Sequence, residues 1–232
     1  FPTRRSSDLD RDAFSPAGAP TLTALRTLVD SCRMEVPEAL PRALACLVGY
    51  FGYETIGLVE SLPRAPANPI GAPDMMFVRP TVLLVFDRLA DALYIVAPVW
   101  PDGSVDAAVE RIEATAARLA TAPLPTPATI EHPPIEPQPA LAPGRYAEMV
   151  LKAKDYIVAG DIFQVVLAQR FSAPFTLPPF ELYRTLRVVN PSPFMFYLRM
   201  PGTTLVGSSP EIMVRVVDGL TTVRPLDRKS VV

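Results

Sequence analysis

The sequence predicts an α+β protein whose strands pair antiparallel, and three observations lead to that prediction. Several apolar runs of strand length follow one another through short turns, which favours antiparallel pairing. Other stretches repeat their apolar residues with the helical period. The segment 123–144 holds eight of the 28 prolines, which excludes a helix or a central strand and indicates an extended linker.

The linker at 123–144 divides the chain into an N-terminal region, 10–122, and a C-terminal region, 145–226. Residues 1–9 and 227–232 show no periodicity, and the chain begins with Phe rather than Met. We interpret both ends as foreign sequence joined to an incomplete gene, so the natural protein is expected to extend beyond them.

Composition narrows the class of protein. The 232 residues are 49% hydrophobic and carry a net charge of −2, without the basic stripe typical of nucleic-acid binding. No apolar run is long enough to cross a membrane. Cys32 and Cys46 lack metal-ligand spacing and are predicted to be buried free thiols in a reducing compartment. We therefore expect a soluble, cytoplasmic protein.

The N-terminal region alternates element types. A helix is predicted over 22–32, and the run 43–56 begins as a strand and ends in a turn marked by glycines. Two apolar runs, 81–87 and 92–100, predict a hairpin. Ser104 is positioned to cap a helix that continues through Leu119.

The C-terminal region opens with a predicted helix that ends at Gly160. Its apolar stripe comprises Tyr146, Met149, Val150, Ala153, Tyr156 and Ile157. Strand-like runs follow at 162–171, 194–200 and 203–207, and a hairpin that turns at Asp218–Gly219 is predicted within 212–225.

The run GDIFQVVLAQRF, 160–171, is apolar but contains polar side chains. If it is a strand, Phe163 lies on a core face, and Gln164 and Arg170 share the opposite face. Gln164 is either a solvated edge residue or an amide that faces a cavity and fixes a polar substrate. Arg170 is interpreted as a structural or solvated cation, with a carboxylate substrate as the alternative partner.

Glu211 follows two serines and a proline in GSSPEIMV. One interpretation is a surface turn in which Ser208 or Ser209 binds backbone groups. The other is a partly buried carboxylic acid that delivers a proton to a leaving group.

In NPSPFMFYLR, 190–199, the prolines stiffen the entry to a strand, and Phe194 with Met195 offers either core or a pocket for a flat ligand. His132, in the linker, is interpreted as solvated.

Four stretches together resemble the anthranilate synthase component I family, the large chorismate-binding subunits. They are LVGYFGYETIGLVESLP (47–63), YIVAGDIFQVVLAQRF (156–171), PSPFMFYLRM (191–200) and LVGSSPEIMVRV (205–216), and the resemblance extends from about 40 to 226. It implies a partial sandwich of antiparallel sheets with helices outside. It also implies conversion of chorismate and ammonia to anthranilate and pyruvate with Mg²⁺, a glutamine amidotransferase partner, and feedback inhibition of tryptophan biosynthesis by L-tryptophan.

The resemblance also assigns residues. Glu211 matches the acid of the family's Ser-Pro-Glu turn, and Gln164 matches the position at which chorismate enzymes that add water carry a lysine base. Pro193, Phe194 and Met195 match contacts of the tryptophan inhibitor.

The match stops after Leu226, where the family continues into a loop that contacts chorismate. The Mg²⁺ carboxylates lie further downstream in the family, so this chain alone is expected to be inactive. Three alternatives remain open: aminodeoxychorismate synthase component I, a non-catalytic tryptophan-sensing module, and a purely structural domain.

Overall fold

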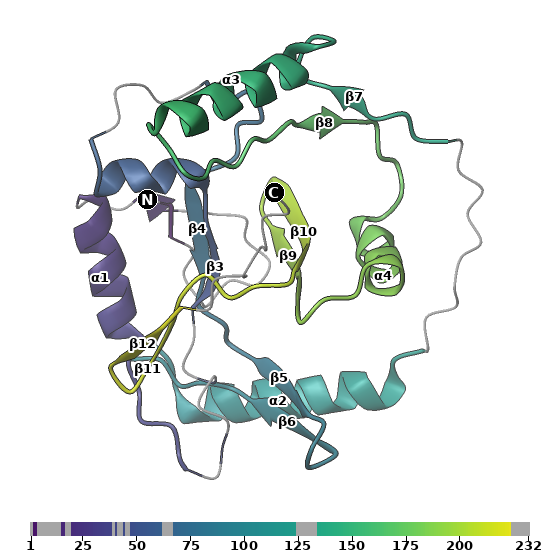
Figure 1. Ribbon diagram of the computed structural model, residues 1–232. Coiled ribbons are helices and arrows are strands. Elements are labelled where there is room, and N and C mark those ends of the chain that lie inside the picture. The colour runs from purple at the N-terminus through teal and green to yellow at the C-terminus, as the bar shows by residue number, and fades with distance from the viewer. Residues whose placement is uncertain are drawn as a thin grey trace. The chain divides into compact units, whose positions relative to one another are not determined.

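The structure, a computed structural model, describes residues 20–38, 40, 44, 47–61, 67–123 and 134–223, and the backbone of 2–3 and 15–16 (Figure 1). The chain forms two compact units. Unit 1 comprises Phe1–Pro125 and Leu198–Leu205, and unit 2 comprises Thr126–Tyr197 and Val206–Val232. Cys46, His132 and the end of the chain from residue 224 lie outside the described residues.

The described elements are short helices and two-stranded sheets. The α-helices are α1 (Thr21–Ser31), α2 (Val105–Thr121), α3 (Arg145–Ala159) and α4 (Pro179–Val189), and η2 (Tyr53–Leu58) is a 3-10 helix. The antiparallel pairs are β1 (Pro2–Thr3) with β2 (Ser15–Pro16), β3 (Val48–Phe51) with β4 (Met75–Val78), β5 (Leu83–Asp87) with β6 (Ala92–Val96), β7 (Gln138–Pro139) with β8 (Phe171–Ser172), and β11 (Arg215–Val217) with β12 (Leu220–Thr222). Strands β9 (Phe194–Met200) and β10 (Thr203–Ser209) form a further hairpin. The predicted α+β class is confirmed.

In unit 1, the predicted hairpin and the helix after it are both confirmed. Strands β5 and β6 turn tightly because the Asp87 carboxylate accepts the N–H groups of Leu89 and Ala90 at 2.9 and 3.1 Å. The hydroxyl of Ser104 accepts the N–H of Ala107 at 3.2 Å and so caps α2. Helix α2 contacts β6 and buries Ala108.

Trp100 anchors the segment between β6 and α2. Its side chain is only 4% exposed, and its indole N–H donates to the carbonyl oxygen of Pro80 at 2.9 Å. The guanidinium of Arg79 lies over the indole ring, 5.1 Å from the centroid, and makes two 2.9 Å hydrogen bonds to the Asp102 carboxylate. Hydrogen bonding, cation–π attraction and ion pairing thus converge on one aromatic residue.

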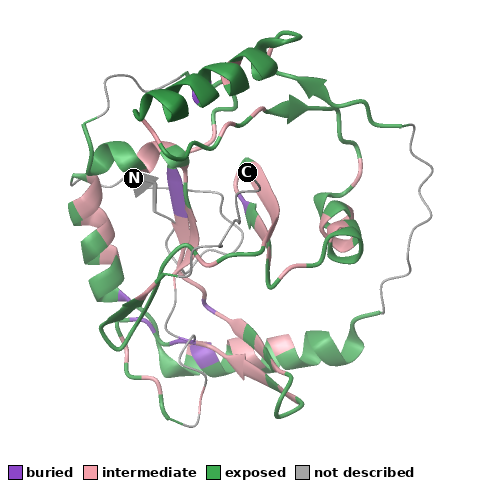
Figure 2. Cartoon of the chain, in the orientation of Figure 1, coloured by how far each residue is buried: buried purple, intermediate pink, exposed green. Residues whose placement is uncertain are grey.

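Strand β4 of the β3–β4 pair supplies two of the most deeply buried side chains of unit 1. Met75 and Met76 are both 2% exposed, and they appear as the buried part of β4 in Figure 2. Gly49 leaves no room for a larger residue, because an added Cβ would overlap the backbone oxygen of Met76. Strand β4 was not predicted, since MMFV lacks the alternation of a half-buried strand.

In unit 2, helix α3 ends at Gly160 as predicted. Gly160 has a φ of +80°, and the N–H of Asp161 reaches back to the carbonyl of Tyr156 at 3.0 Å. Asp218 and Gly219 have φ of +50° and +77°, so the predicted β11–β12 turn is also confirmed. Of the predicted apolar stripe on α3, Ala153 alone is fully buried. None of the described helices has the length and hydropathy needed to cross a lipid bilayer.

Helix α4 was missed in the sequence. Its start carries the expected signals, Pro179 in the first turn and Glu181 near the N-terminus. An aromatic cluster holds it against β9: the Tyr197 ring lies 5.2 Å from the Phe180 centroid and 5.9 Å from the Tyr183 centroid. These contacts fix where the chain leaves α4 and enters β9.

Candidate active site

Glu211 lies in the turn that follows β10, within unit 2. The Ser209 hydroxyl donates to the Glu211 carbonyl at 3.1 Å and accepts the Glu211 N–H at 3.4 Å. This arrangement is the serine turn that the sequence offered as its first interpretation. The Glu211 residue is exposed, so the partial burial expected of a proton donor is not present here. The turn fixes the backbone of Glu211 without covering its side chain.

The segment Asn190–Pro193 lies beside that turn. Helix α4 ends at Asn190, whose N–H donates to the carbonyl of Leu186 at 2.9 Å, and Pro191 cannot continue the helix. The Ser192 hydroxyl donates to the Ser209 carbonyl at 2.7 Å. Two separate motifs of the sequence, NPSPFMF and GSSPE, therefore meet at one end of the β9–β10 hairpin.

A second hydrogen bond ties the same two segments. The hydroxyl of Ser208 donates to the carbonyl oxygen of Asn190 at 3.0 Å. We call these four residues, Asn190, Ser192, Ser208 and Ser209, the serine clasp. The sequence predicts Ser208 and Ser209 only as turn residues and gives no direct sign of their connection with Ser192. The predicted strand runs at 194–200 and 203–207 were the signal that could have found the connection, since a turn at 201–202 pairs them antiparallel and brings their outer ends together.

The predicted inhibitor contacts lie at the start of β9, directly after the clasp. Pro193 and Phe194 are exposed, and Met195 is half-buried. Within unit 2 these residues therefore present an accessible apolar surface next to the Glu211 turn.

The prediction of a strand over 162–171 is wrong. Only Phe171–Ser172 is a strand, β8, and 164–170 is irregular. The expected core face is open, with Phe163 99% exposed. A strand is stabilised by a ladder of backbone hydrogen bonds to a neighbouring strand. Here the pairing between β7 and β8 includes only Phe171 and Ser172 of β8. One further backbone bond, from the Ala140 N–H to the Arg170 carbonyl at 2.8 Å, extends the contact.

Gln164 is exposed and lies in this irregular segment. No hydrogen bond joins it to Glu211 among the residues that the structure describes. The roles that the resemblance assigns to these two residues therefore stay predictions. Arg170 is likewise exposed.

Among the residues that the structure describes, the Tyr50 phenol in unit 1 has a pKa that its surroundings raise. Burial, and secondly the nearby negative charge of Asp74, raise the pKa of the Tyr50 phenol. The Tyr50 hydroxyl donates to the carbonyl of Pro73 at 2.8 Å. This residue stabilises the β3–β4 region and has no assigned chemical role.

Over the described ranges, no three or more histidine, cysteine, aspartate or glutamate side chains gather as metal ligands. The described side chains therefore do not fit Mg²⁺, since they form no cluster of ligands that would hold it.

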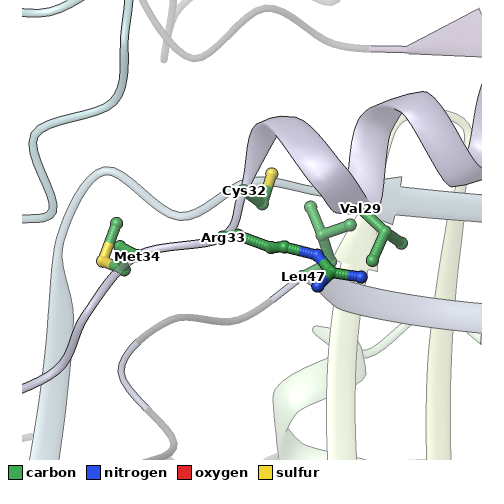
Figure 3. A pocket seen from close by; sticks show the side chains of 5 residues that line it. All are labelled: Val29, Cys32, Arg33, Met34 and Leu47. Atoms are coloured by element: carbon green, nitrogen blue, oxygen red, sulfur yellow. The ribbon is translucent and has the colours of Figure 1, made fainter.

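A shallow hollow of about 490 Å³ lies in unit 1 at the end of α1 (Figure 3). Its lining comprises Val29, Cys32, Arg33, Met34 and Leu47. Cys32 is a buried free thiol, as predicted. Arg33 lies across the hollow and pairs with Asp30 at 3.0 Å. None of the predicted site residues lines it, so it is not the candidate active site.

A profile of the chorismate binding enzymes matches residues 11–227, and the chain belongs to this family. In particular, it is similar to anthranilate synthase component 1 from Cereibacter sphaeroides, with 43% identity over 96% of this chain and 46% of that protein. The Thermus thermophilus component 1 is 40% identical over 96% of this chain and 48% of that protein.

A solved structure gives the same result for the fold. The crystal structure of anthranilate synthase component I from Streptococcus pneumoniae superposes with a TM-score of 0.74 at 32% identity, covering 86% of this chain and 46% of that one. The chain thus spans about half the length of the curated relatives it matches. The predicted family and fold class are both confirmed.

Proposed function

We propose that this chain is part of an anthranilate synthase large subunit, which converts chorismate and ammonia to anthranilate, pyruvate and water. The observation that carries the proposal is the 43% identity to an anthranilate synthase component 1 over 96% of the chain. The four motifs quoted above lie within the family match at 11–227.

The proposed chemistry begins at Glu211. Its carboxylic acid gives a proton to the ring hydroxyl of chorismate, which leaves as water while ammonia attacks the ring. Loss of the enolpyruvyl group as pyruvate then yields anthranilate. Glu211 is exposed among the described residues. Water must therefore be excluded from this turn before the proton is transferred, since the position of an acid in bulk water gives it little catalytic advantage.

Gln164 is proposed to face the nucleophile. A neutral amide can orient ammonia, and ammonia needs no base to become nucleophilic. The irregular, exposed 164–170 segment must then become ordered near the substrate, because the described geometry does not join Gln164 to Glu211.

The remaining parts of the proposal concern partners and regulation. A glutamine amidotransferase subunit supplies ammonia in the cytoplasm, and Mg²⁺ is required by the complete enzyme. L-tryptophan binds against Pro193, Phe194 and Met195 and inhibits. The accessible start of β9 supports this assignment, because it offers an aromatic ring and a thioether to an indole.

The test is an assay of the protein that carries this sequence, supplied with chorismate, ammonium and Mg²⁺. Anthranilate fluorescence and equimolar pyruvate are the expected result, and the 232 residues alone are expected to give neither. A product that retains the enolpyruvyl ether would replace the proposal with aminodeoxychorismate synthesis. Tryptophan binding without any turnover would replace it with a sensing module.

A further inference from the structure

Backbone N–H groups cannot extend the hydrogen-bond ladder of the β9–β10 hairpin toward Glu211. Pro191 and Pro193 precede β9, and Pro210 follows β10. Proline has no N–H, so three of the backbone donors that would continue the ladder are missing. Without a substitute, the two strand ends would separate just where Glu211 is attached.

The serine clasp supplies that substitute. The Ser192 hydroxyl bonds the Ser209 carbonyl at 2.7 Å, and the Ser208 hydroxyl bonds the Asn190 carbonyl at 3.0 Å. One bond runs from the entry of β9 to the end of β10, and the other runs in the opposite direction. Two side-chain donors therefore replace backbone donors across the same gap.

The connection continues to the acid. Ser209 receives the bond from Ser192 on its carbonyl, and its hydroxyl contacts both the N–H and the carbonyl of Glu211 at 3.4 and 3.1 Å. The backbone orientation of Glu211 is thus set by Ser209, which is itself held by Ser192. A change in that orientation redirects the Cα–Cβ bond and with it the carboxyl group.

We propose that Ser192 and Ser209 are positioning residues that orient Glu211 for proton transfer. This inference rests on the role of Glu211 in the proposed function. It assigns to the serines no contact with substrate, since they act through the backbone of the turn. It also explains why a serine precedes the proline on each side of the hairpin end.

The first experiment measures kinetics in the complete enzyme. Ser209→Ala and Ser192→Ala are expected to lower kcat by about 10- to 100-fold with little change in KM, because misplacement affects the transition state most. Ser209→Thr, which keeps a hydroxyl, should recover most of the loss. Ser208→Ala breaks only the Asn190 bond and should cost less. Ser31→Ala is the matched control, since it removes an equivalent 2.7 Å bond to the Leu28 carbonyl in α1.

The second experiment separates positioning from general damage. In a Glu211→Gln background, Ser209→Ala should produce no further loss of kcat, because the group it orients is already absent. A loss of the same size in both backgrounds would overturn the proposal and leave Ser209 a merely structural residue.

A third measurement does not depend on catalysis. Amide hydrogen exchange at Glu211 should accelerate by about 3- to 10-fold in Ser192→Ala and Ser209→Ala, the factor expected from one lost hydrogen bond. Unchanged exchange would overturn the clasp. If exchange accelerates but Glu211→Gln keeps full turnover, Glu211 is not the general acid of the proposed function. The two serines would then still hold the turn, but they would have no role in catalysis.

Discussion

The ring of Phe196 on β9 lies directly against the Cα of Gly207 on β10, so closely that a Cβ at position 207 would overlap three ring atoms. The φ of Gly207 is not in the left-handed region, so its backbone conformation does not require glycine. The space taken by the Phe196 ring is therefore what requires a glycine at this position. This pair closes the middle of the same hairpin whose end carries the serine clasp and Glu211.

Replacing Gly207 by Ala should destabilise unit 2, because the Phe196 ring must leave its position. We expect a loss of about 1–3 kcal/mol in the free energy of unfolding, typical of overpacking. Chemical denaturation monitored by circular dichroism measures it. Gly57→Ala is the control, since nothing lies within 4 Å of its added Cβ. Equal stability of the two variants would contradict the packing argument.

Removing the indole of Trp100 should destabilise unit 1. In Trp100→Phe the Pro80 carbonyl loses its donor and Arg79 loses part of its ring contact. The expected cost is about 2 kcal/mol, combining the lost hydrogen bond to a half-buried carbonyl oxygen with the loss of packing by a smaller side chain. Leu89→Ala, at a fully exposed position, serves as the control in thermal unfolding and should change stability little.

Stability should fall at alkaline pH through Tyr50. Burial and then Asp74 raise its pKa above the unfolded value of 10.0, so the folded chain holds the phenolic proton more tightly than the unfolded chain. The resulting stabilisation is complete below about pH 10 and is lost as pH rises through the folded pKa. Denaturation midpoints of the native chain and Tyr50→Phe between pH 8 and 11 should converge as pH rises. Parallel curves would exclude this linkage.

Glu211→Gln should lower turnover with chorismate by about 10²- to 10⁴-fold, the usual contribution of a general acid. The amide keeps the shape of the side chain but has no proton to give at neutral pH. Anthranilate fluorescence in the complete enzyme provides the rate. Glu113→Gln, on the exposed surface of α2, is the matched control. Full turnover of the Glu211 variant would remove it from the mechanism.

Gln164→Lys should shift the nucleophile from ammonia toward water. A lysine at this position can act as a base for water, and its charge disfavours binding of ammonium. We expect anthranilate formation to fall by at least about 10-fold and an isomer of chorismate with a transposed hydroxyl group to appear, resolved from chorismate by chromatography because its mass is the same. Gln169→Lys, in the same segment, should not produce that compound. Its formation by both variants would argue for a nonspecific effect of charge.

Much of the local structure was predictable because its causes lie within a few residues. Ser104 caps α2, Gly160 ends α3, and Asp218–Gly219 turns a hairpin, each through backbone groups close in sequence. Helix α4 and strand β4 were missed, since the aromatic contacts to Tyr197 and the burial of Met75 arise from distant partners. The strand over 162–171 failed for the opposite reason: its composition favours extension, but β7 pairs with only one residue of that range, Phe171.

The sequence by itself determined the family, the α+β class and the identity of the candidate acid, because motif residues and periodic patterns are local properties of the chain. Only the tertiary structure decided that NPSPFMF and GSSPE meet, that Ser192 holds Ser209, and that Ser209 holds Glu211. Hydrogen bonds between residues seventeen positions apart depend on how β9 folds back on β10, and no local propensity specifies which hydroxyl finds which carbonyl.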